Sequence, residues 1–132
     1  MLMKFFVAVI FMTLLPGAFA SDNVKPACNR ACLENYVNRY MDAMLVNKPD
    51  LKLFSREVKF TENGVRLPLG GEGLWANMSG KGNYKFYIPD IETQQIAFIG
   101  TARESLAGSG DGNLVAIALR LKILNGQITE VE

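Results

Sequence analysis

Apolar residues recur at a helical spacing near the start of the chain. They occupy positions 32, 33, 36, 37, 40, 41, 44 and 45, which form one stripe of a 3.6-residue period. This spacing predicts a helix from about residue 27 to 46, ended by Asn47 and the Lys-Pro pair that follows it. Residues 50 to 54 are expected to form a second, short helical turn. That turn would cover the core with Leu51, Leu53 and Phe54.

The segment from residue 58 to 69, VKFTENGVRLPL, alternates apolar and polar positions around Asn63-Gly64. Asn-Gly is typical of a two-residue type I′ hairpin, because both central positions need a positive φ. Such a turn pairs neighbouring positions on the two strands: Glu62 with Val65, Phe60 with Leu67 and Val58 with Leu69. Glu62 is then the one acid on an otherwise apolar face of the hairpin.

The second half of the chain has the period of strands. We expect strands at 84 to 88, 95 to 104, 114 to 124 and 127 to 131, the last two joined by a second Asn-Gly turn. The glycine-rich segment GGEGLWANMSGKG before them is expected to be a loop that holds one short helix. Helices followed by a meandering antiparallel sheet make the fold class α+β. The last strand is short beside its long partner, so a truncated C-terminus is one expectation for this chain.

Residues 1 to 20, MLMKFFVAVIFMTLLPGAFA, have the pattern of a secretory signal peptide. A single lysine precedes the apolar run, and Ala-Phe-Ala stands before the predicted cleavage site at Ser21. The run is short for a membrane anchor. We therefore expect an exported protein, periplasmic or extracellular, with a single domain from 21 to 132 and no membrane attachment after cleavage.

Cys28 and Cys32 are the two cysteines of the chain, and both lie in the part predicted to be exported. An oxidising compartment favours a disulfide between them. A regular helix would hold the two Cβ atoms too far apart, so Cys28 is expected at or just before the helix start. No metal site is expected, because the chain has no histidine and no second cysteine pair.

The charge balance of the exported part argues against nucleic acid as a partner. Of the 14 basic residues only Lys4 lies in the predicted signal peptide, so 13 basic residues face 13 acidic ones. Arg120 falls on the less apolar face of its strand, as a solvated or dimer-facing cation. The absence of histidine also removes Ser-His-Asp and Cys-His nucleophiles. The glycines lack the context of a phosphate or dinucleotide loop, so no cofactor is expected.

Several short motifs, taken in order, resemble an exported family of the nuclear transport factor 2-like superfamily. They are CNRACL, FTENG, LPLG, EGLW and ALRLKILNGQITEVE, and the closing Asn-Gly-Gln-Ile-Thr-Glu hairpin is similar to that of the SnoaL-like branch. The resemblance covers almost all of the chain from Cys28 onward. It implies a curved sheet wrapped round the first helix as a cone with an apolar pocket, usually in a homodimer. The superfamily contains isomerases, cyclases and lyases as well as members without catalysis, so the fold alone does not select a function.

Glu62 is the main candidate for chemistry. A carboxylate that faces an apolar pocket is harder to ionise and can act as a general acid or base. In the superfamily's steroid isomerases an acid on the strand after the helices does this work, and the resemblance leaves Glu62 and Asn63 as alternative counterparts. The other interpretation is that Glu62 reaches water at the rim, beside the turn.

Aromatic residues complete the candidate site. Tyr36 and Tyr40, one helical turn apart, are either hydroxyl donors to a developing oxyanion or ordinary core tyrosines. Trp75 either caps the pocket and stacks on an aromatic ligand or anchors its loop as a plug. Phe60 and Asn63 would add ligand contacts.

Two functions stay open at this point. The first is a binding domain with an apolar pocket for a small apolar or aromatic molecule, or a surface for another protein. The second is a cofactor-independent isomerase, lyase or cyclase in which Glu62 is the acid or base and Tyr36 and Tyr40 are the donors. The binding domain is preferred, because one acid without an established partner is a thin catalytic set.

Overall fold

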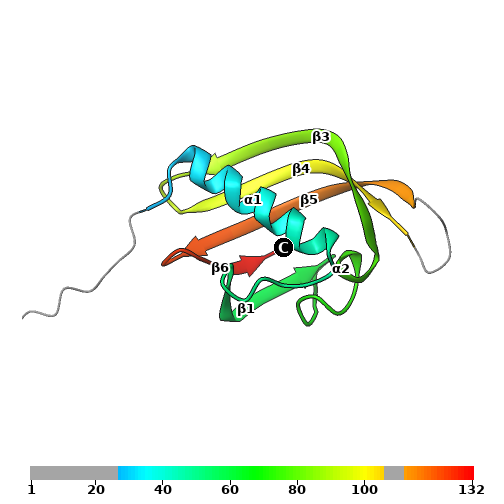
Figure 1. Ribbon diagram of the computed structural model, residues 1–132. Helices are drawn as coiled ribbons and strands as arrows, with labels where there is room; N and C mark the ends of the chain where they lie inside the picture. The colour runs from blue at the N-terminus through cyan, green and yellow to red at the C-terminus, as the bar shows by residue number, and fades with distance from the viewer. Residues whose placement is uncertain (1–26, 106–111) are drawn as a thin grey trace, which may run out of the picture.

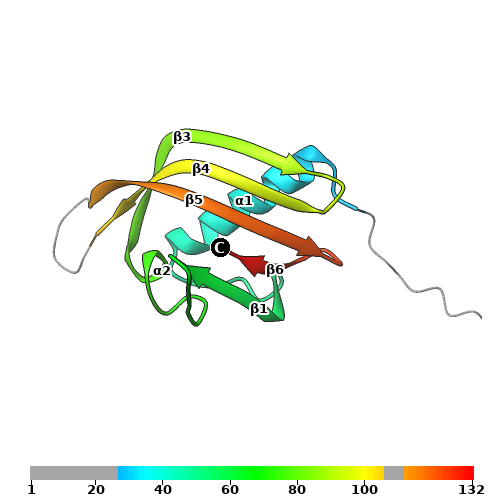
Figure 2. The ribbon, with the colours of Figure 1, turned by 180° about the vertical axis from the view of Figure 1, so that it is seen from behind.

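The computed structural model describes residues 27 to 105 and 112 to 132, so the predicted signal peptide lies outside the described residues. The elements are α1 (Arg30–Leu45), β1 (Phe54–Glu62), β2 (Val65–Arg66), α2 (Leu74–Asn77), β3 (Met78–Asp90), β4 (Gln95–Glu104), β5 (Asn113–Leu124) and β6 (Gln127–Val131). The six strands form one curved, unclosed sheet in the order β2-β1-β6-β5-β4-β3. Helix α1 packs across one face of this sheet, as Figures 1 and 2 show from opposite sides. The predicted α+β class is confirmed.

Helix α1 is the helix that the apolar stripe predicts. The side chain of its N-cap, Asn29, accepts a hydrogen bond from the Cys32 N–H at 3.0 Å. Asn47 follows the helix with a φ of 51°, which ends the helical backbone where the sequence predicted. Six of the stripe positions are buried against the sheet: Leu33, Tyr36, Val37, Tyr40, Met41 and Met44. Of the two helices within the described ranges, neither is long and apolar enough to cross a membrane.

The predicted disulfide between Cys28 and Cys32 is present, with the two Cα atoms 5.2 Å apart. Cys28 precedes the N-cap Asn29, as the geometric argument required. The side chain of Gln94, in the turn between β3 and β4, accepts from the Cys28 N–H at 2.6 Å and donates to the Cys28 carbonyl at 3.0 Å. The disulfide and the two Gln94 hydrogen bonds hold the start of α1 against the sheet. A disulfide is compatible with an exported protein.

The expectation of a wholly antiparallel sheet is wrong, because β6 pairs in parallel with β1. The Asn125-Gly126 turn sets β6 antiparallel to β5, as predicted, and leaves the other edge of β6 open. Strand β1 occupies that edge and runs in the same direction as β6. The sheet is therefore mixed, and β6 lies between β1 and β5 (Figure 1).

The turn before β1 also differs from the expectation. Residues 51 to 53 form a non-helical turn, and Phe54 is already the first residue of β1. Asp50 closes this turn by accepting from the Lys52 N–H with its side chain and from the Leu53 N–H with its carbonyl. Leu53 and Phe54 are buried as expected, but Leu51 is 85% exposed and does not cover the core.

Strand β3 is longer than the predicted strand from 84 to 88. It runs past Pro89 to Asp90 because β3 is the edge strand of the sheet, where a residue without an N–H costs no ladder hydrogen bond. The strand from 95 to 104 has the predicted bounds, and β5 begins one residue earlier than predicted. The core lies between α1 and the inner face of these strands, where Ile96 faces Leu121 and Phe98 faces Leu119.

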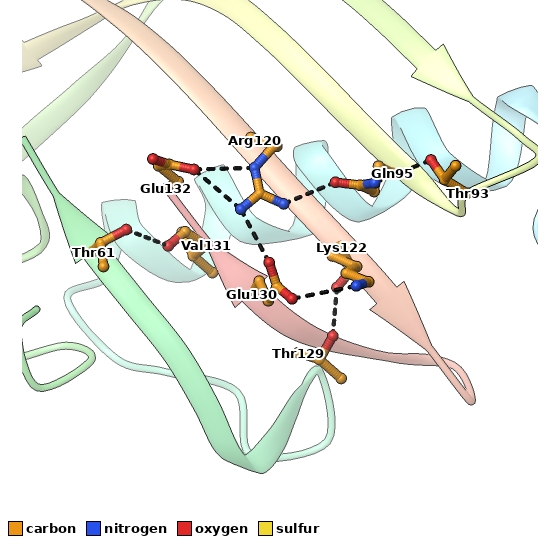
Figure 3. A network of polar contacts seen from close by, with 9 residues as sticks. All are labelled: Thr61, Thr93, Gln95, Arg120, Lys122, Thr129, Glu130, Val131 and Glu132. Atoms are coloured by element: carbon orange, nitrogen blue, oxygen red, sulfur yellow. Dashed lines mark hydrogen bonds and ion pairs between the residues drawn. The ribbon is translucent and has the colours of Figure 1, made fainter. Parts of the chain in front are cut away.

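A charged network occupies the outer face where β5 and β6 meet (Figure 3). The Arg120 guanidinium donates to Gln95 at 2.8 Å, to Glu130 at 3.0 Å and to Glu132 at 3.0 Å. Lys122 donates to the second oxygen of Glu130 at 3.3 Å. Arg120 therefore lies on the outer face, as predicted, but pairs with carboxylates of the neighbouring strand.

We expect Glu130→Gln to reduce the acid sensitivity of the fold. Hydrogen bonds from Arg120 hold the pKa of Glu130 below its ordinary value of 4.5, and partial burial opposes this shift. The pairing stabilises fully above pH 4.5, and its contribution disappears as the pH falls through the lower folded value. The variant should lose about 0.5–1 kcal/mol at pH 7 and less at low pH, measured by urea unfolding. An equal loss at both pH values contradicts this, and Glu57→Gln, at an exposed position, is the control.

Candidate functional site

A cavity of about 310 Å³ lies between α1, α2, β1 and the first half of β5. Its exposed walls are polar and apolar in equal measure, with apolar and aromatic side chains beside carboxyl, hydroxyl and amide groups. The lining residues are Tyr40, Met44, Phe60, Thr61, Glu62, Asn63, Leu74, Trp75, Glu104, Val115, Ala116, Ile117, Ala118, Leu119, Val131 and Glu132. Five of the candidate residues from the sequence therefore meet in one place: Glu62, Tyr40, Trp75, Phe60 and Asn63.

The β1–β2 hairpin places Glu62 at this cavity. Asn63 and Gly64 form the predicted turn, with φ values of 51° and 78°, and Glu62 pairs with Val65. The Leu67 N–H donates to the Phe60 carbonyl at 3.2 Å, which is the last contact of the hairpin ladder. The predicted pairing of Val58 with Leu69 does not form, because Pro68 has no N–H to donate and the chain turns away after it.

The Glu62 carboxylate caps helix α2. Both of its oxygens accept from the Leu74 N–H, each at 3.2 Å, so a half-buried acid satisfies the first turn of a helix whose N-cap residue, Gly73, has no side chain. Gly73 has a φ of 62° and a ψ of −145°, and a Cβ added to it would lie 2.2 Å from a Glu62 oxygen. Glycine at 73 is thus what lets the carboxylate approach. The sequence-based alternatives, a base in the pocket or an acid at the rim, did not include this role.

Tyr40 lies at the buried end of the cavity. Its hydroxyl accepts from the Trp75 indole N–H at 2.9 Å, and the two rings meet edge to face with centroids 5.4 Å apart. Burial raises the pKa of Tyr40 well above the ordinary value of 10.0, opposed by the Trp75 hydrogen bond, and the charge of Glu62 raises it further. Tyr40 is therefore a neutral phenol, and among the described residues no acceptor takes its proton. Within the described residues the Tyr40 hydroxyl therefore acts as an acceptor.

Replacing Tyr40 with phenylalanine should destabilise the domain by about 1–3 kcal/mol, because the buried Trp75 N–H loses its acceptor. Urea unfolding followed by tryptophan fluorescence measures this. Tyr84→Phe, at a side chain that is 57% exposed, is the matched control and should change stability by less than about 0.5 kcal/mol. Equal effects of the two variants would show that the Tyr40 hydroxyl contributes nothing to the core.

Trp75 belongs to the core more than to a lid. Its side chain is fully buried, and it contacts Phe54 edge to face in addition to Tyr40. Its backbone carbonyl accepts from the Asn47 side chain, which joins α2 to the end of α1. Of the two interpretations from the sequence, the geometry favours the plug that anchors the glycine-rich loop.

Tyr36 does not line the cavity. Its hydroxyl donates to the Gly126 carbonyl at 2.8 Å, in the turn between β5 and β6. The expectation that Tyr36 and Tyr40 direct their hydroxyls into one site is therefore not met. Tyr36 and Tyr40 are one helical turn apart along α1. This distance places Tyr36 next to the turn between β5 and β6, and Tyr40 next to α2.

The first half of β5 is part of the cavity wall that no motif indicated. Arg120 and Glu132 exchange backbone hydrogen bonds at 2.8 and 3.0 Å, and no described residue pairs with β5 on this side before Arg120. Backbone groups of a strand alternate between its two neighbours, so those of Ala118 and Ala116 point to the same side as those of Arg120. Both alanines line the cavity. The signal in the sequence was the length of this strand, whose alternation of apolar residues continues from Leu119 back to Val115.

The charge at the cavity is negative. Glu62, Glu104 and Glu132 line it, while no lysine or arginine of the described residues does. Glu132 is paired with Arg120 on the outer face, whereas Glu62 and Glu104 form no ion pair with any residue that the structure describes. Within residues 27–105 and 112–132 no group of three or more potential ligands is placed to hold a metal ion.

Comparisons with models of protein families, with curated proteins and with solved structures gave no match. The function is therefore argued from the cavity and its surroundings.

Proposed function

We propose that this chain is an exported binding domain of the nuclear transport factor 2-like superfamily, whose cone-shaped cavity binds a ligand with an apolar or aromatic group. The observation that supports this most is the cavity of about 310 Å³ beside Tyr40, Phe60 and Trp75. That volume lies at the lower end of the range for small-molecule sites, which are mostly apolar with a few polar groups that orient the ligand. The Tyr40 hydroxyl and the carboxylates supply such groups.

The binding proposal is tested with 2-naphthol, a small neutral aromatic molecule, titrated into the mature domain and followed by amide chemical shifts. We expect saturable shifts confined to the residues that line the cavity. Ile117→Trp should block binding by filling the cavity, while Leu114→Trp, at a position that is 61% exposed and does not line it, should not. Shifts that do not saturate, or that map elsewhere, would reject the cavity as a ligand site.

A second candidate is a cofactor-independent acid-base enzyme, an isomerase, lyase or cyclase. It is favoured by one observation, that Glu62 and Tyr40 line the same cavity. The Leu74 N–H engages both oxygens of Glu62, which favours a structural role and places this candidate second. With 5-nitrobenzisoxazole as a proton-transfer probe, the enzyme hypothesis expects turnover that Glu62→Gln abolishes. Equal rates for the two proteins would remove Glu62 as the base.

The homodimer implied by the resemblance stays a prediction. The outer face of β3 and β4 exposes Phe86 and Ile88 on one strand and Ile99 on the next, where a second copy would pack. Sedimentation velocity tests this: a dimer that Phe86→Lys converts to a monomer is expected, and a wild-type monomer at all concentrations contradicts it.

A further inference from the structure

We infer that the cavity selects a cation: its ligand is an ammonium group attached to an aromatic or other apolar body, held beside α2 by the carboxylates of Glu62 and Glu104. This inference rests on the proposed binding function and names the chemical class of the ligand. Three features of the described residues carry it: the place of the two acids, the lack of a cation that neutralises them, and the hydrogen bonds already made around them.

The two acids flank α2, the short helix of the cavity wall. The Glu62 carboxylate lies at the start of α2, where it accepts from the Leu74 N–H at 3.2 Å. Glu104 lies at the other end, because it pairs with Met78, the residue that follows α2. A helix of this length extends only about 6 Å. A ligand beside α2 therefore has an acid at each end of the helix.

The side chain of Glu104 is on the cavity side of the sheet. Phe98, Ala102 and Glu104 are separated by even steps along β4, and both Phe98 and Ala102 are buried on the inner face. Side chains at this spacing share a face of the sheet. Ala102 also pairs with Val115 of β5, which lines the cavity as Glu104 does. The Glu104 carboxyl thus contributes its charge to the cavity and not to the outer face.

The cations nearest to these acids along the sheet are held elsewhere. Arg103 precedes Glu104, but it is on the opposite face of β4 and donates to the Gly112 carbonyl at 3.3 Å. Arg120 is held by carboxylates on the outer face (Figure 3). The segment from 106 to 111 that follows in the sequence reads LAGSGD and contains no lysine or arginine. A cationic ligand would supply the charge that complements the acids.

The hydrogen bonds at the cavity favour a ligand that donates. The Trp75 indole N–H already donates to the Tyr40 hydroxyl at 2.9 Å. The Thr61 hydroxyl donates to the Val131 carbonyl at 3.1 Å. The Glu62 carboxylate accepts only the Leu74 N–H among the described residues, although a carboxylate has about four acceptor positions. An ammonium group has several N–H donors and no acceptor, so it matches the acceptors that are left.

The aromatic residues beside the acids attract the same group. Cations are drawn to the faces of tryptophan and tyrosine rings, and Tyr40, Phe60 and Trp75 line the cavity. The charge of Glu62 also reaches the buried end of the cavity. Burial is the main cause of the raised pKa of Tyr40 and the Trp75 hydrogen bond opposes it, but the charge of Glu62 adds to the rise. An ammonium group there would be stabilised by the carboxylates, while its apolar body packs against the aromatic side chains.

Three ligands that share a naphthalene ring test the selection by charge. They are 2-naphthylmethylamine, a cation at neutral pH, 2-naphthylmethanol, which is neutral, and 2-naphthylacetate, an anion. Each is titrated into the mature domain and followed by amide chemical shifts. We expect the amine to bind about tenfold more tightly than the alcohol, and the acetate to bind more weakly than either. Higher ionic strength should reduce the preference for the amine and leave the affinity of the alcohol unchanged.

Variants of the protein assign the preference to the acids. Glu104→Gln should lower the ratio of amine affinity to alcohol affinity from about tenfold to about threefold. Glu57→Gln, at an exposed position of β1 that does not line the cavity, is the matched control and should keep the full ratio. Because both ligands are measured on the same protein, a change in stability affects the two affinities alike and leaves their ratio intact.

Equal affinities for the amine and the alcohol would overturn the inference and leave the binding proposal standing. A preference for the amine that Glu104→Gln does not reduce would also overturn it, since the selection would then come from charges outside the cavity. Absence of binding by all three ligands and by 2-naphthol would reject both the inference and the binding proposal.

Discussion

Trp75→Ala is expected to lower the free energy of unfolding by about 3–5 kcal/mol, the largest effect of any substitution we consider. The indole is fully buried and contacts Tyr40 and Phe54 edge to face, so its removal leaves a large hole between α1, α2 and β1. The Tyr40 hydroxyl also loses its hydrogen-bond donor. Urea unfolding followed by circular dichroism measures the loss, since the variant has no tryptophan.

Leu51→Ala is the control for this experiment. Both residues are large and apolar, but Leu51 is 85% exposed, so its replacement should change stability by less than about 0.5 kcal/mol. A loss below about 1.5 kcal/mol for Trp75→Ala would show that the loop around α2 is not anchored by this side chain.

Gly73→Ala should have the second largest effect. Its φ of 62° and ψ of −145° belong to a region that glycine alone adopts readily, which costs alanine about 1–3 kcal/mol. The added Cβ would also lie 2.2 Å from a Glu62 oxygen, so the carboxylate must move and the Leu74 N–H loses its acceptor. We expect a total loss of about 2–4 kcal/mol by urea unfolding, together with loss of ligand binding in the cavity.

Gly71→Ala, two residues away in the same loop, is the matched control. A Cβ at this position meets nothing within 4 Å, and Gly71 does not have a positive φ, so a change of less than about 0.5 kcal/mol is expected. In a Glu62→Ala background the steric part of the Gly73→Ala effect should disappear, leaving the backbone part. If the stability losses of Glu62→Ala and Gly73→Ala simply add in the double variant, Glu62 makes no contribution to the effect of Gly73→Ala.

Local patterns in the sequence predicted most of the elements. The helical stripe predicted the buried face of α1, and the two Asn-Gly pairs predicted both hairpin turns, because each of these signals depends on neighbouring residues. The expectations failed where contacts between residues far apart in the sequence decide the structure. Leu51 is exposed, and β6 pairs in parallel with β1 although the two strands are far apart in the sequence. The local alternation of apolar and polar residues does not indicate which strand will pair with the free edge of another strand.

The candidate site was predicted in part. Pairing through the first Asn-Gly turn placed Glu62 beside the cavity, as the alternation implied, but its contact with the Leu74 N–H depends on a loop whose conformation the sequence does not specify. Tyr36 and Tyr40 share the helix stripe, yet only Tyr40 lines the cavity, because the neighbouring turn takes the Tyr36 hydroxyl.

Titration of 2-naphthol into the mature domain, followed by amide chemical shifts, tests most directly the central claim that the cavity between α1, α2, β1 and β5 binds an apolar or aromatic group. The account predicts saturable shifts at residues that line the cavity, Phe60 and Leu119 among them, and the loss of these shifts in Ile117→Trp. Shifts that do not saturate, or that map to residues elsewhere, would contradict the account.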